Sequence, residues 1–286
     1  TSTRGKTELT INADGTPKDN KTGLDYDYIT EYSYGRLESF NLFIPRFMGG
    51  SSTEEFPKDS KTVESLMRMG ASSEEANQVL GQIPMYWGDQ TFVGAPAYIG
   101  AIIIFLSVLA LFLIRGRLKW WVISAFVLTL LLSWGKNFSL LTNFFIDYIP
   151  LYDKFRAVSS IQVILELCIP VLAIMGLQSF FKLENGEQKK AILKSGGVAL
   201  GLIAVLFLIK GSFSFSTPSD ARFQEYGADF IAALKSDRRS LYSADLLRSG
   251  FLIAISASFL WLFIKNKISQ NVAVILVGVF MIGDLY

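Results

Sequence analysis

The 286-residue sequence contains no histidine and a single cysteine, Cys168. Without histidine, the chain lacks the commonest general base and the commonest metal ligand of proteins. A Ser-His-Asp or Cys-His centre therefore cannot be built from this chain alone, and a zinc site is not expected. One cysteine also excludes an intrachain disulfide. Any acid–base chemistry falls to Asp, Glu, Tyr or Lys side chains.

A charge excess and nucleotide-binding motifs are missing as well. The 27 Lys and Arg residues nearly balance the 25 Asp and Glu residues, which gives a net charge of +2. In a membrane protein this balance averages over two faces, so it indicates little about partners. The sequence has neither a GxGxxG motif nor a P-loop, and we expect no nucleic-acid partner.

Long apolar runs are what the sequence does have, and they are unevenly placed. Residues 1–93 are polar, charged and rich in glycine, whereas the rest alternates apolar runs with short charged connectors. Apolar runs of roughly 17–25 residues can cross the ~30 Å hydrocarbon core of a bilayer as helices. The predicted runs span residues 94–114, 119–134, 160–181, 195–213, 249–264 and 269–286. We therefore predict a polytopic α-helical membrane protein with about six transmembrane helices.

The basic residues of the connectors predict the orientation. Lys and Arg gather in the first, third and fifth connections, at Arg115, Arg117 and Lys119, at Lys182 to Lys194, and at Lys265 and Lys267. Short loops rich in Lys and Arg stay in the cytoplasm. The alternation then places residues 1–93, 135–159 and 214–248 outside.

The outer segments are predicted to be mixed but mainly helical. The first 93 residues form an extracytoplasmic cap on the bundle of residues 94–286. Within it, alternation predicts a strand at residues 8–11, and helical spacing predicts helices at residues 25–43, 60–69 and 72–82. Ser72 or Ser73 can cap the last of these. A surface helix is expected within residues 219–247, and Arg239, Asp245 and Arg248 after it are interpreted as a structural ion-pair cluster.

The outer loop at residues 135–159 is unusually apolar for a connector. It is full of Phe, Leu, Ile and Tyr, and the cations Lys136 and Arg156 bracket it. A segment that lies along a membrane face has this composition, with its cations at headgroup depth. The loop therefore indicates lipid-phosphate chemistry at the outer surface.

Short motifs recur in the outer segments and carry a resemblance. They are Tyr32-Ser33-Tyr34-Gly35 with Glu38, Ile44-Pro45 with Gly49-Gly50-Ser51, Tyr86-Trp87-Gly88-Asp89-Gln90 with Tyr98-Ile99-Gly100, Ser133-Trp134-Gly135-Lys136-Asn137, and Lys154-Phe155-Arg156-Ala157. In this order and loop placement, over nearly the whole chain, they resemble the signature of the YfhO-like bacterial membrane proteins. The version here is most similar to the long proteins of Bacteroidota.

This resemblance implies a large multi-pass protein of the GT-C glycosyltransferase type in the bacterial cytoplasmic (inner) membrane. Such enzymes take a sugar from a polyprenyl-phosphate carrier at the outer face and give it to a cell-envelope glycan acceptor. In the YfhO-like proteins of Gram-positive bacteria the acceptor is lipoteichoic acid; here it stays open. The essential Asp of GT-C enzymes would lie before Thr1. Because the chain starts without a signal peptide and ends in an apolar run, we expect a fragment of a longer protein, inactive alone.

Two other functions remain open from the sequence. A flippase or transporter of lipid-linked sugars would need polar residues along a path through several helices, and the runs are mostly apolar. A non-catalytic envelope-assembly protein would bind a polymer through residues 1–93.

The resemblance assigns the donor phosphate to Lys136 and Arg156, since Arg suits bidentate phosphate contact and Lys supplies a point charge. Simple interfacial snorkelling is the alternative. Glu38 is a candidate base or sugar ligand, or else a salt-bridge partner of Arg36, Arg46 or Arg4.

Three further groups are candidates. Trp87 with Asp89 can form a sugar platform, although Trp87 also suits an interfacial anchor. Asp25 and Asp27 match an Asp-x-Asp metal motif, and Asp27 is also a candidate catalytic carboxylate; a solvated turn explains them equally, and we otherwise expect no cofactor. Glu166 lies within a membrane run, where a carboxylate faces a cavity or an ionic partner.

Overall fold

The computed structural model describes residues 24–57 and 59–285, except the side chain of Asn77. In this part of the chain the regular elements are helices and no strand is present. The α-helices are α1 (Tyr26–Ile29), α2 (Lys61–Arg68), α3 (Ser73–Leu80), α4 (Ala101–Leu113), α5 (Arg117–Ser133), α6 (Ser139–Tyr148), α7 (Gln162–Phe180), α8 (Asn185–Leu208), α9 (Ala228–Ile264) and α10 (Gln270–Leu285). The predicted helical class is confirmed, while the strand expected at residues 8–11 lies outside the described residues.

Three helical segments are long and apolar enough to cross a membrane, namely Val158–Phe180, Asn185–Ser212 and Ala228–Ile264. A fourth crossing results if α5 and the segment Gly135–Tyr148, bent by 114° from it, form one broken span. The apolar helices α4 and α10 are shorter. The chain is thus a helical protein of membrane-spanning composition with three to four candidate spans, and the prediction of six is not confirmed.

The first predicted run, residues 94–114, is helical only from Ala101 onward. With 13 residues, α4 extends for about 20 Å, which is less than the ~30 Å hydrocarbon core. Pro96 and the glycines around it interrupt the preceding residues. The carboxylate of Asp284 caps α4, accepting the Ala101 N–H at 2.8 Å and the Tyr98 hydroxyl at 2.7 Å. This contact joins the start of α4 to the end of α10.

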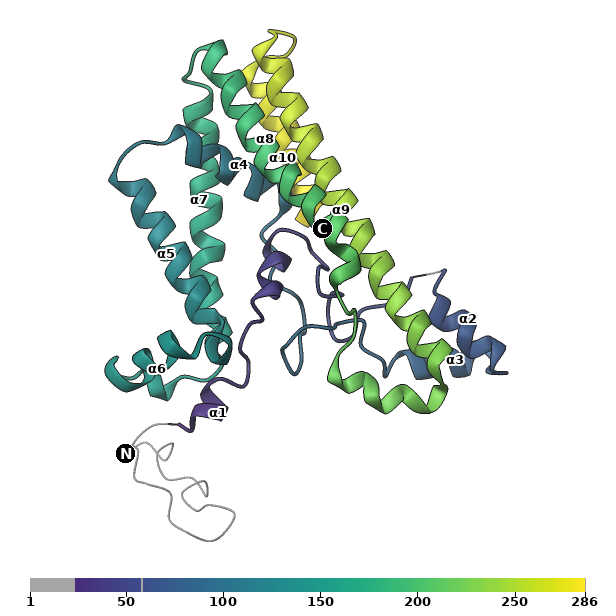
Figure 1. The fold of residues 1–286 in the computed structure, drawn as a ribbon. Coiled ribbons are helices and arrows are strands. Elements are labelled where there is room, and N and C mark those ends of the chain that lie inside the picture. Colours follow the sequence, from purple (N-terminus) through teal and green to yellow (C-terminus); the bar gives the residue numbers. More distant parts are fainter. Residues whose placement is uncertain (1–23, 58, 286) are drawn as a thin grey trace.

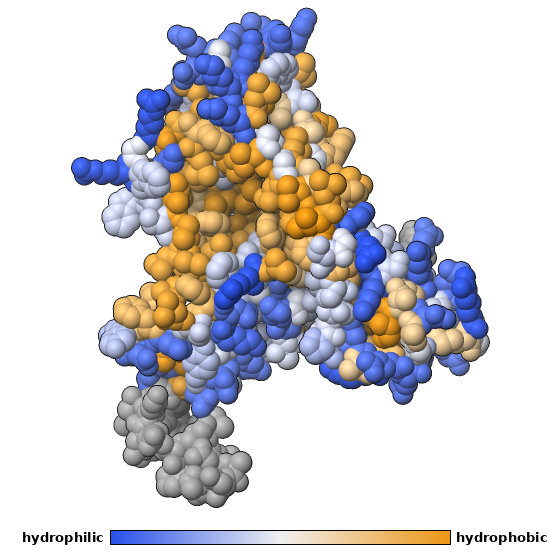
Figure 2. Space-filling model, viewed as in Figure 1, coloured by the Kyte–Doolittle hydropathy of each residue, from blue (hydrophilic) through white to orange (hydrophobic). Residues whose placement is uncertain are grey.

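The helices form two arms that converge at one end of the molecule (Figure 1). One arm contains α5 and α7, and the other contains α8, α9 and α10, with α4 packed against members of both arms. The buried core residues Leu106, Leu109, Leu165 and Ile169 lie where α4 meets α7. Between the arms the surface is hollowed and apolar, with hydrophilic surface above and below it (Figure 2).

The connectors segregate to the two ends of the helices (Figure 1). The links between α4 and α5, α7 and α8, and α9 and α10 lie at one end, and α1 and the links before α7 and α9 lie at the other. The membrane topology itself stays a prediction. One boundary differs: α8 starts at Asn185, so Lys189, Lys190 and Lys194 lie on its first turns rather than in a connector.

The helix α9 is 37 residues long and corrects a predicted boundary. The sequence suggested a surface helix within residues 219–247 and a separate membrane run at 249–264. These merge because no glycine or proline occurs between Ala228 and Ser249, and Gly250 alone costs only about 1 kcal/mol in a helix. At ~1.5 Å per residue, α9 extends for about 55 Å, well beyond a bilayer core. Its polar first half therefore projects from the apolar bundle.

The N-terminal region is less helical than predicted. Only α1 and a short 3-10 segment, Leu37–Leu42, form within residues 25–43. The intervening residues instead make tertiary hydrogen bonds, described below. The helices expected at residues 60–69 and 72–82 are confirmed as α2 and α3. Ser72, rather than Ser73, caps α3, because its backbone N–H donates to Glu75 and its Oγ accepts the Glu75 N–H.

Candidate functional site at the loop-bearing end of the bundle

Two motifs about 100 residues apart in the sequence run against each other at the end of α5. The Tyr34 N–H donates to the Ser133 carbonyl at 2.8 Å. The Lys136 N–H donates to Ser33 Oγ at 2.9 Å, and the Asn137 side-chain amide donates to the Tyr34 carbonyl at 3.0 Å. These bonds satisfy both backbone groups of Tyr34 outside any helix. They explain why the helix predicted over this segment does not form.

A buried carboxylate joins the same segment to the Tyr86 to Gln90 motif. Glu38 is fully buried (0% exposed) and accepts hydrogen bonds from the Tyr86 hydroxyl and the Gly35 N–H. The Tyr86 oxygen in turn accepts the Gln90 N–H at 2.9 Å. Burial raises the pKa of Glu38 to about 7, the Gly35 N–H opposes the shift, and the charge of Asp89 adds to it. Glu38 thus joins the two loops, and its raised pKa makes its protonation state change near neutral pH.

The two loops approach so closely that glycine is needed at the contact. A Cβ at Gly88 would collide with Glu38 Oε1 and the Tyr86 hydroxyl, and a Cβ at Gly35 would lie 2.7 Å from Asp89 Oδ2. The arrangement therefore depends on both glycines of the paired motifs. None of the salt bridges considered for Glu38 is seen in the described residues: Arg46 binds Asp245 and Glu54, Arg36 binds a carbonyl, and Arg4 lies outside them.

A cavity of about 330 Å³ opens beside these loops. Its lining residues are Arg36, Leu37, Met48, Trp87, Gly88, Asp89, Asn137, Ser214 and Ser216. We refer to it as the Trp87 cavity. Trp87 and Asp89, predicted as a sugar platform, therefore do line one cavity. Glu38 lies behind Gly88 and is not among the lining residues.

The Trp87 ring is not an open platform in this structure. Only 8% of the residue is exposed, and its ring packs against Phe215 with centroids 4.9 Å apart. Its indole N–H is buried and has no hydrogen-bond partner among the described residues. Buried Trp N–H groups usually find an acceptor. Trp87, a residue that lines the cavity, therefore keeps a buried donor without an acceptor, and Asp89 in the same lining is exposed.

Sequence reasoning missed four polar residues that line this cavity. Arg36 and Asn137 stood inside the quoted motifs, and they bind each other: the Arg36 Nε donates to the Asn137 carbonyl at 2.9 Å. Ser214 and Ser216 alternate with Phe213 and Phe215 in the sequence. That alternation separates two faces, because Phe215 is fully buried against Trp87 while the serines line the cavity. This alternation of phenylalanine and serine was the sequence signal that could have predicted one buried and one accessible face.

Lys136 and Arg156, the predicted phosphate ligands, differ in their surroundings. Arg156 is exposed and pairs with Glu31 at 2.7 Å, and it stacks on the rings of Tyr28 and Tyr32. Lys136 is exposed, and its ammonium group has no ion pair within residues 24–57 and 59–285. Both lie on the loop that contacts residues 32–34, since the Ser159 N–H donates to the Tyr32 carbonyl at 3.3 Å. Of these two cations, only Lys136 has no ion pair in the described residues.

The remaining predicted positions have simpler settings. Asp25 caps α1 by accepting the Asp27 N–H at 3.1 Å, and both side chains are exposed. No group of three His, Cys, Asp or Glu side chains suited to a metal occurs in the described part of the chain. Glu166 is exposed on α7 beside the exposed apolar residues Val163 and Leu167. Its partner at membrane depth stays a prediction.

The expected cluster of Arg239, Asp245 and Arg248 does not form, because each finds a different partner. Asp245 accepts two hydrogen bonds from the Arg46 guanidinium, at 2.7 and 2.8 Å. Arg248 pairs with Asp284 at 3.3 Å. Arg239 lies over the ring of Phe215. Charged residues that are spaced along one helix point toward different parts of the fold. Their spacing in the sequence does not reveal which partner each one meets.

The strongest anchors of α9 are two neighbouring charges. Arg238 is fully buried and donates to both Asp220 oxygens, at 2.7 and 2.9 Å, and to the carbonyls of Phe215 and Pro84. Asp237 accepts from the hydroxyls of Ser60 and Thr62 and from the first N–H groups of α2. Together they fix α2 and the Phe213–Ser216 segment, and so one wall of the Trp87 cavity.

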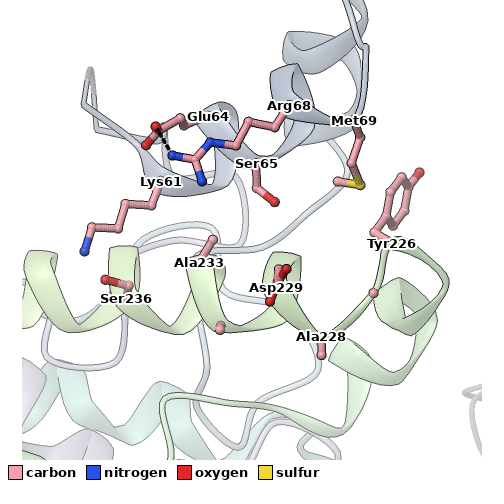
Figure 3. A pocket seen from close by; sticks show the side chains of 12 residues that line it. Lys61, Glu64, Ser65, Arg68, Met69, Tyr226, Ala228, Asp229, Ala233 and Ser236 are labelled. Atoms are coloured by element: carbon pink, nitrogen blue, oxygen red, sulfur yellow. Dashed lines mark hydrogen bonds and ion pairs between the residues drawn. The ribbon is translucent and has the colours of Figure 1, made fainter.

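A second hollow lies between α2 and the first turns of α9 (Figure 3). This α2–α9 groove has a volume of about 820 Å³. Alanines of α9 line one side, and Lys61, Glu64 and Arg68 of α2 line the other. Glu64 and Arg68 form an exposed i,i+4 pair at 2.6 Å. The groove contains none of the predicted site residues.

Searches for similar proteins returned no match among family models, curated proteins or solved structures. The resemblance to the YfhO-like proteins therefore rests on the motifs alone and stays a prediction. What the fold and site define is a class: a helical protein with three to four candidate membrane spans and a polar cavity at one end of its helices.

Proposed function

We propose that this chain is part of a GT-C-type membrane glycosyltransferase. It would transfer a sugar from a polyprenyl-phosphate donor to a cell-envelope glycan acceptor on the outer face of the bacterial cytoplasmic membrane. In this proposal the bundle has six spans, residues 1–93 form an extracytoplasmic cap, and the Trp87 cavity binds a sugar ring of the donor or the acceptor.

The observation that carries the proposal is the composition of the Trp87 cavity wall. Ligand pockets combine apolar surface with a few polar groups that fix orientation. Here Met48 and Leu37 supply apolar surface, Asp89 supplies an acceptor and Arg36 supplies donors, while the buried Trp87 N–H lacks an acceptor. At about 330 Å³, the cavity is near the lower limit of the ~300–1,000 Å³ typical of ligand sites. A single sugar ring suits this volume and this mixture of groups.

The adjacent cations support a donor that carries phosphate. Lys136 precedes Asn137, which lines the cavity, and its ammonium group is exposed and unpaired in the described residues. An anionic group beside the cavity would gain a charge-assisted contact there. Arg156 could join only by exchanging its bond to Glu31. We therefore assign the first phosphate contact to Lys136 and an auxiliary one to Arg156.

The burial of Glu38 favours a binding role for this part of the molecule over a catalytic one. A general base must come within hydrogen-bond reach of its substrate. Glu38 is 0% exposed and its oxygens are already bonded to Tyr86 and Gly35. The second candidate function, a non-catalytic envelope-assembly protein that binds glycan, follows from the same observation.

A transfer assay separates these two functions. Membranes containing the full-length protein would be incubated with radiolabelled polyprenyl-phosphate hexose, as wild type, Asp89→Asn, Lys136→Ala and Arg156→Ala. Asp229→Asn and Arg68→Ala are matched controls, because these charges lie at the α2–α9 groove. We expect label in a non-donor product for wild type and controls, and a loss of transfer for Asp89→Asn and Lys136→Ala. Retention of bound label without transfer would support the assembly protein, and equal transfer by all variants would refute the site.

A further inference from the structure

The helix α6 exposes two different stripes side by side. Leu140, Phe144 and Tyr148 are 79%, 50% and 72% exposed, and they follow one another at a spacing of four residues. Residues at this spacing share one helix face. An exposed row of three large apolar side chains has no function in water, so it indicates a contact surface.

The neighbouring stripe of α6 is polar and also exposed. Ser139, Asn143 and Asp147 follow the same four-residue spacing, each one position before a member of the apolar row. The remaining side of the helix faces the protein, where Thr142 is fully buried and donates to the Gly135 carbonyl at 2.8 Å. The surface of α6 thus has a buried side, an exposed apolar stripe and an exposed polar stripe.

The direction of α6 fits the boundary of a membrane. The segment Gly135–Tyr148 is bent by 114° from α5, and the two helices have the composition of a membrane crossing only when they are taken together. A helix nearly perpendicular to a spanning helix lies close to the membrane plane. In Figure 1, α6 lies across the lower end of α5, at the same end of the bundle as α1.

The apolar row continues beyond the helix and joins the surface of the bundle. Leu151 and Phe155 in the following turn are 67% and 69% exposed. In Figure 2 the apolar surface of the spanning helices continues down to the region where α6 lies. A patch continuous with the lipid-facing surface, and bordered by a polar stripe, matches a lipid–water boundary better than a protein interface.

We propose that α6 lies in the lipid–water interface and inserts Leu140, Phe144 and Tyr148 among the lipid chains, with Leu151 and Phe155 beside them. The polar row of Asn143 and Asp147 then faces water. This anchor fixes at headgroup depth the loop whose two ends carry Lys136 and Arg156. The inference does not depend on the proposed transferase activity, because it concerns only where the loop lies.

Spin labels at adjacent positions test this arrangement. Phe144→Cys and Asn143→Cys would be made in a Cys168→Ser background, labelled with a nitroxide and reconstituted as the full chain in phosphatidylcholine–phosphatidylglycerol vesicles. We expect oxygen, which concentrates in lipid, to relax the label at position 144 more than a water-soluble nickel chelate does. At position 143 the ratio of the two effects is expected to reverse.

Two results would overturn the proposal. Nickel access at both positions would place the whole exposed face of α6 in water. Low access of both reagents at position 144 would mean that protein, such as a second copy of the chain, covers the apolar row. An unchanged elution volume of the labelled variants compared with the Cys168→Ser protein establishes that the fold is retained.

Discussion

The two hollows of the molecule differ in whether a residue of their lining has a buried polar group without a partner. The α2–α9 groove has the greater volume, about 820 Å³ against 330 Å³ for the Trp87 cavity. In the groove Glu64 and Arg68 pair with each other, whereas Lys61 and Asp229 are exposed and have no ion pair in the described chain. The elements around the groove are fixed by Asp237 and Arg238. Among the residues that line the Trp87 cavity, by contrast, the indole N–H of Trp87 is buried and has no partner in the described chain.

This contrast separates a structural hollow from a binding site. Exposed ion pairs such as Glu64–Arg68 are worth little and need no ligand. A buried donor without an acceptor carries a cost that a bound ligand can remove. Unsatisfied polar groups are therefore a better guide to a site than volume.

The largest expected effect concerns the anchor that both hollows share. Arg238→Ala leaves the carboxylate of Asp220 buried without its partner, and such a loss costs about 3–5 kcal/mol. We expect a large fall in the thermal unfolding temperature of the detergent-solubilised protein. Arg239→Ala is the matched control, since Arg239 is exposed and only lies over a ring. Similar melting curves for the two variants would mean that the anchor is not needed.

The pH dependence of stability tests the buried contacts of Glu38 behind the Trp87 cavity. Folding raises the pKa of Glu38 from an ordinary 4.5 to about 7. The folded state then binds this proton more tightly, so the stabilisation is fully present below about pH 4.5 and is lost as the pH rises through 7. The loss is on the order of 3 kcal/mol at ~1.4 kcal/mol per pKa unit. Between pH 4 and 8 we expect the unfolding temperature of wild type to fall more steeply than that of Glu38→Gln. The two curves should therefore converge or cross. Parallel curves would contradict the shifted pKa.

A single methyl group is expected to disturb the cavity without unfolding the bundle. In Gly88→Ala the added Cβ meets Glu38 Oε1 and the Tyr86 hydroxyl, and overpacking of this kind costs about 1–3 kcal/mol. Gly94→Ala is the control, because the nearest atom to its Cβ would be 3.9 Å away. Binding of polyprenyl-phosphate hexose in vesicles should fall for Gly88→Ala only. Equal binding by both variants would show that the loop contact does not shape the site.

The smallest effect is expected in the α2–α9 groove. Glu64→Gln removes an exposed i,i+4 ion pair, which is worth about 0.3–0.5 kcal/mol. We expect almost no change in unfolding temperature or in hexose-lipid binding. A clear loss of binding would assign a ligand to this groove and reverse the comparison.

Local patterns predicted what depends on local physics. The apolar runs predicted most of the long helices, and Ser72 with Glu75 marked the start of α3. The single helix α9 was predictable in retrospect, because nothing in its sequence stops a helix before Gly250. The loss of helix between Thr30 and Arg36 was not predictable, since it depends on hydrogen bonds to residues 133–137.

For the site, the sequence predicted residues but not their relations. Trp87 and Asp89 were expected together and do line one cavity. The burial of Glu38 depends on the approach of Gly88, which no one-dimensional pattern encodes. The separation of Arg239, Asp245 and Arg248 toward different partners likewise follows only from the packing around α9.

The central claim is that the Trp87 cavity binds a sugar, and the most direct test removes the unused indole donor of Trp87 together with part of its ring. Binding of polyprenyl-phosphate hexose would be measured in vesicles for wild type and Trp87→Phe, which keeps an aromatic ring but lacks the N–H. A lost hydrogen bond of about 0.5–1.5 kcal/mol predicts a roughly 2- to 13-fold weaker affinity. An unchanged affinity, with the folded protein intact, would contradict the assignment of the cavity.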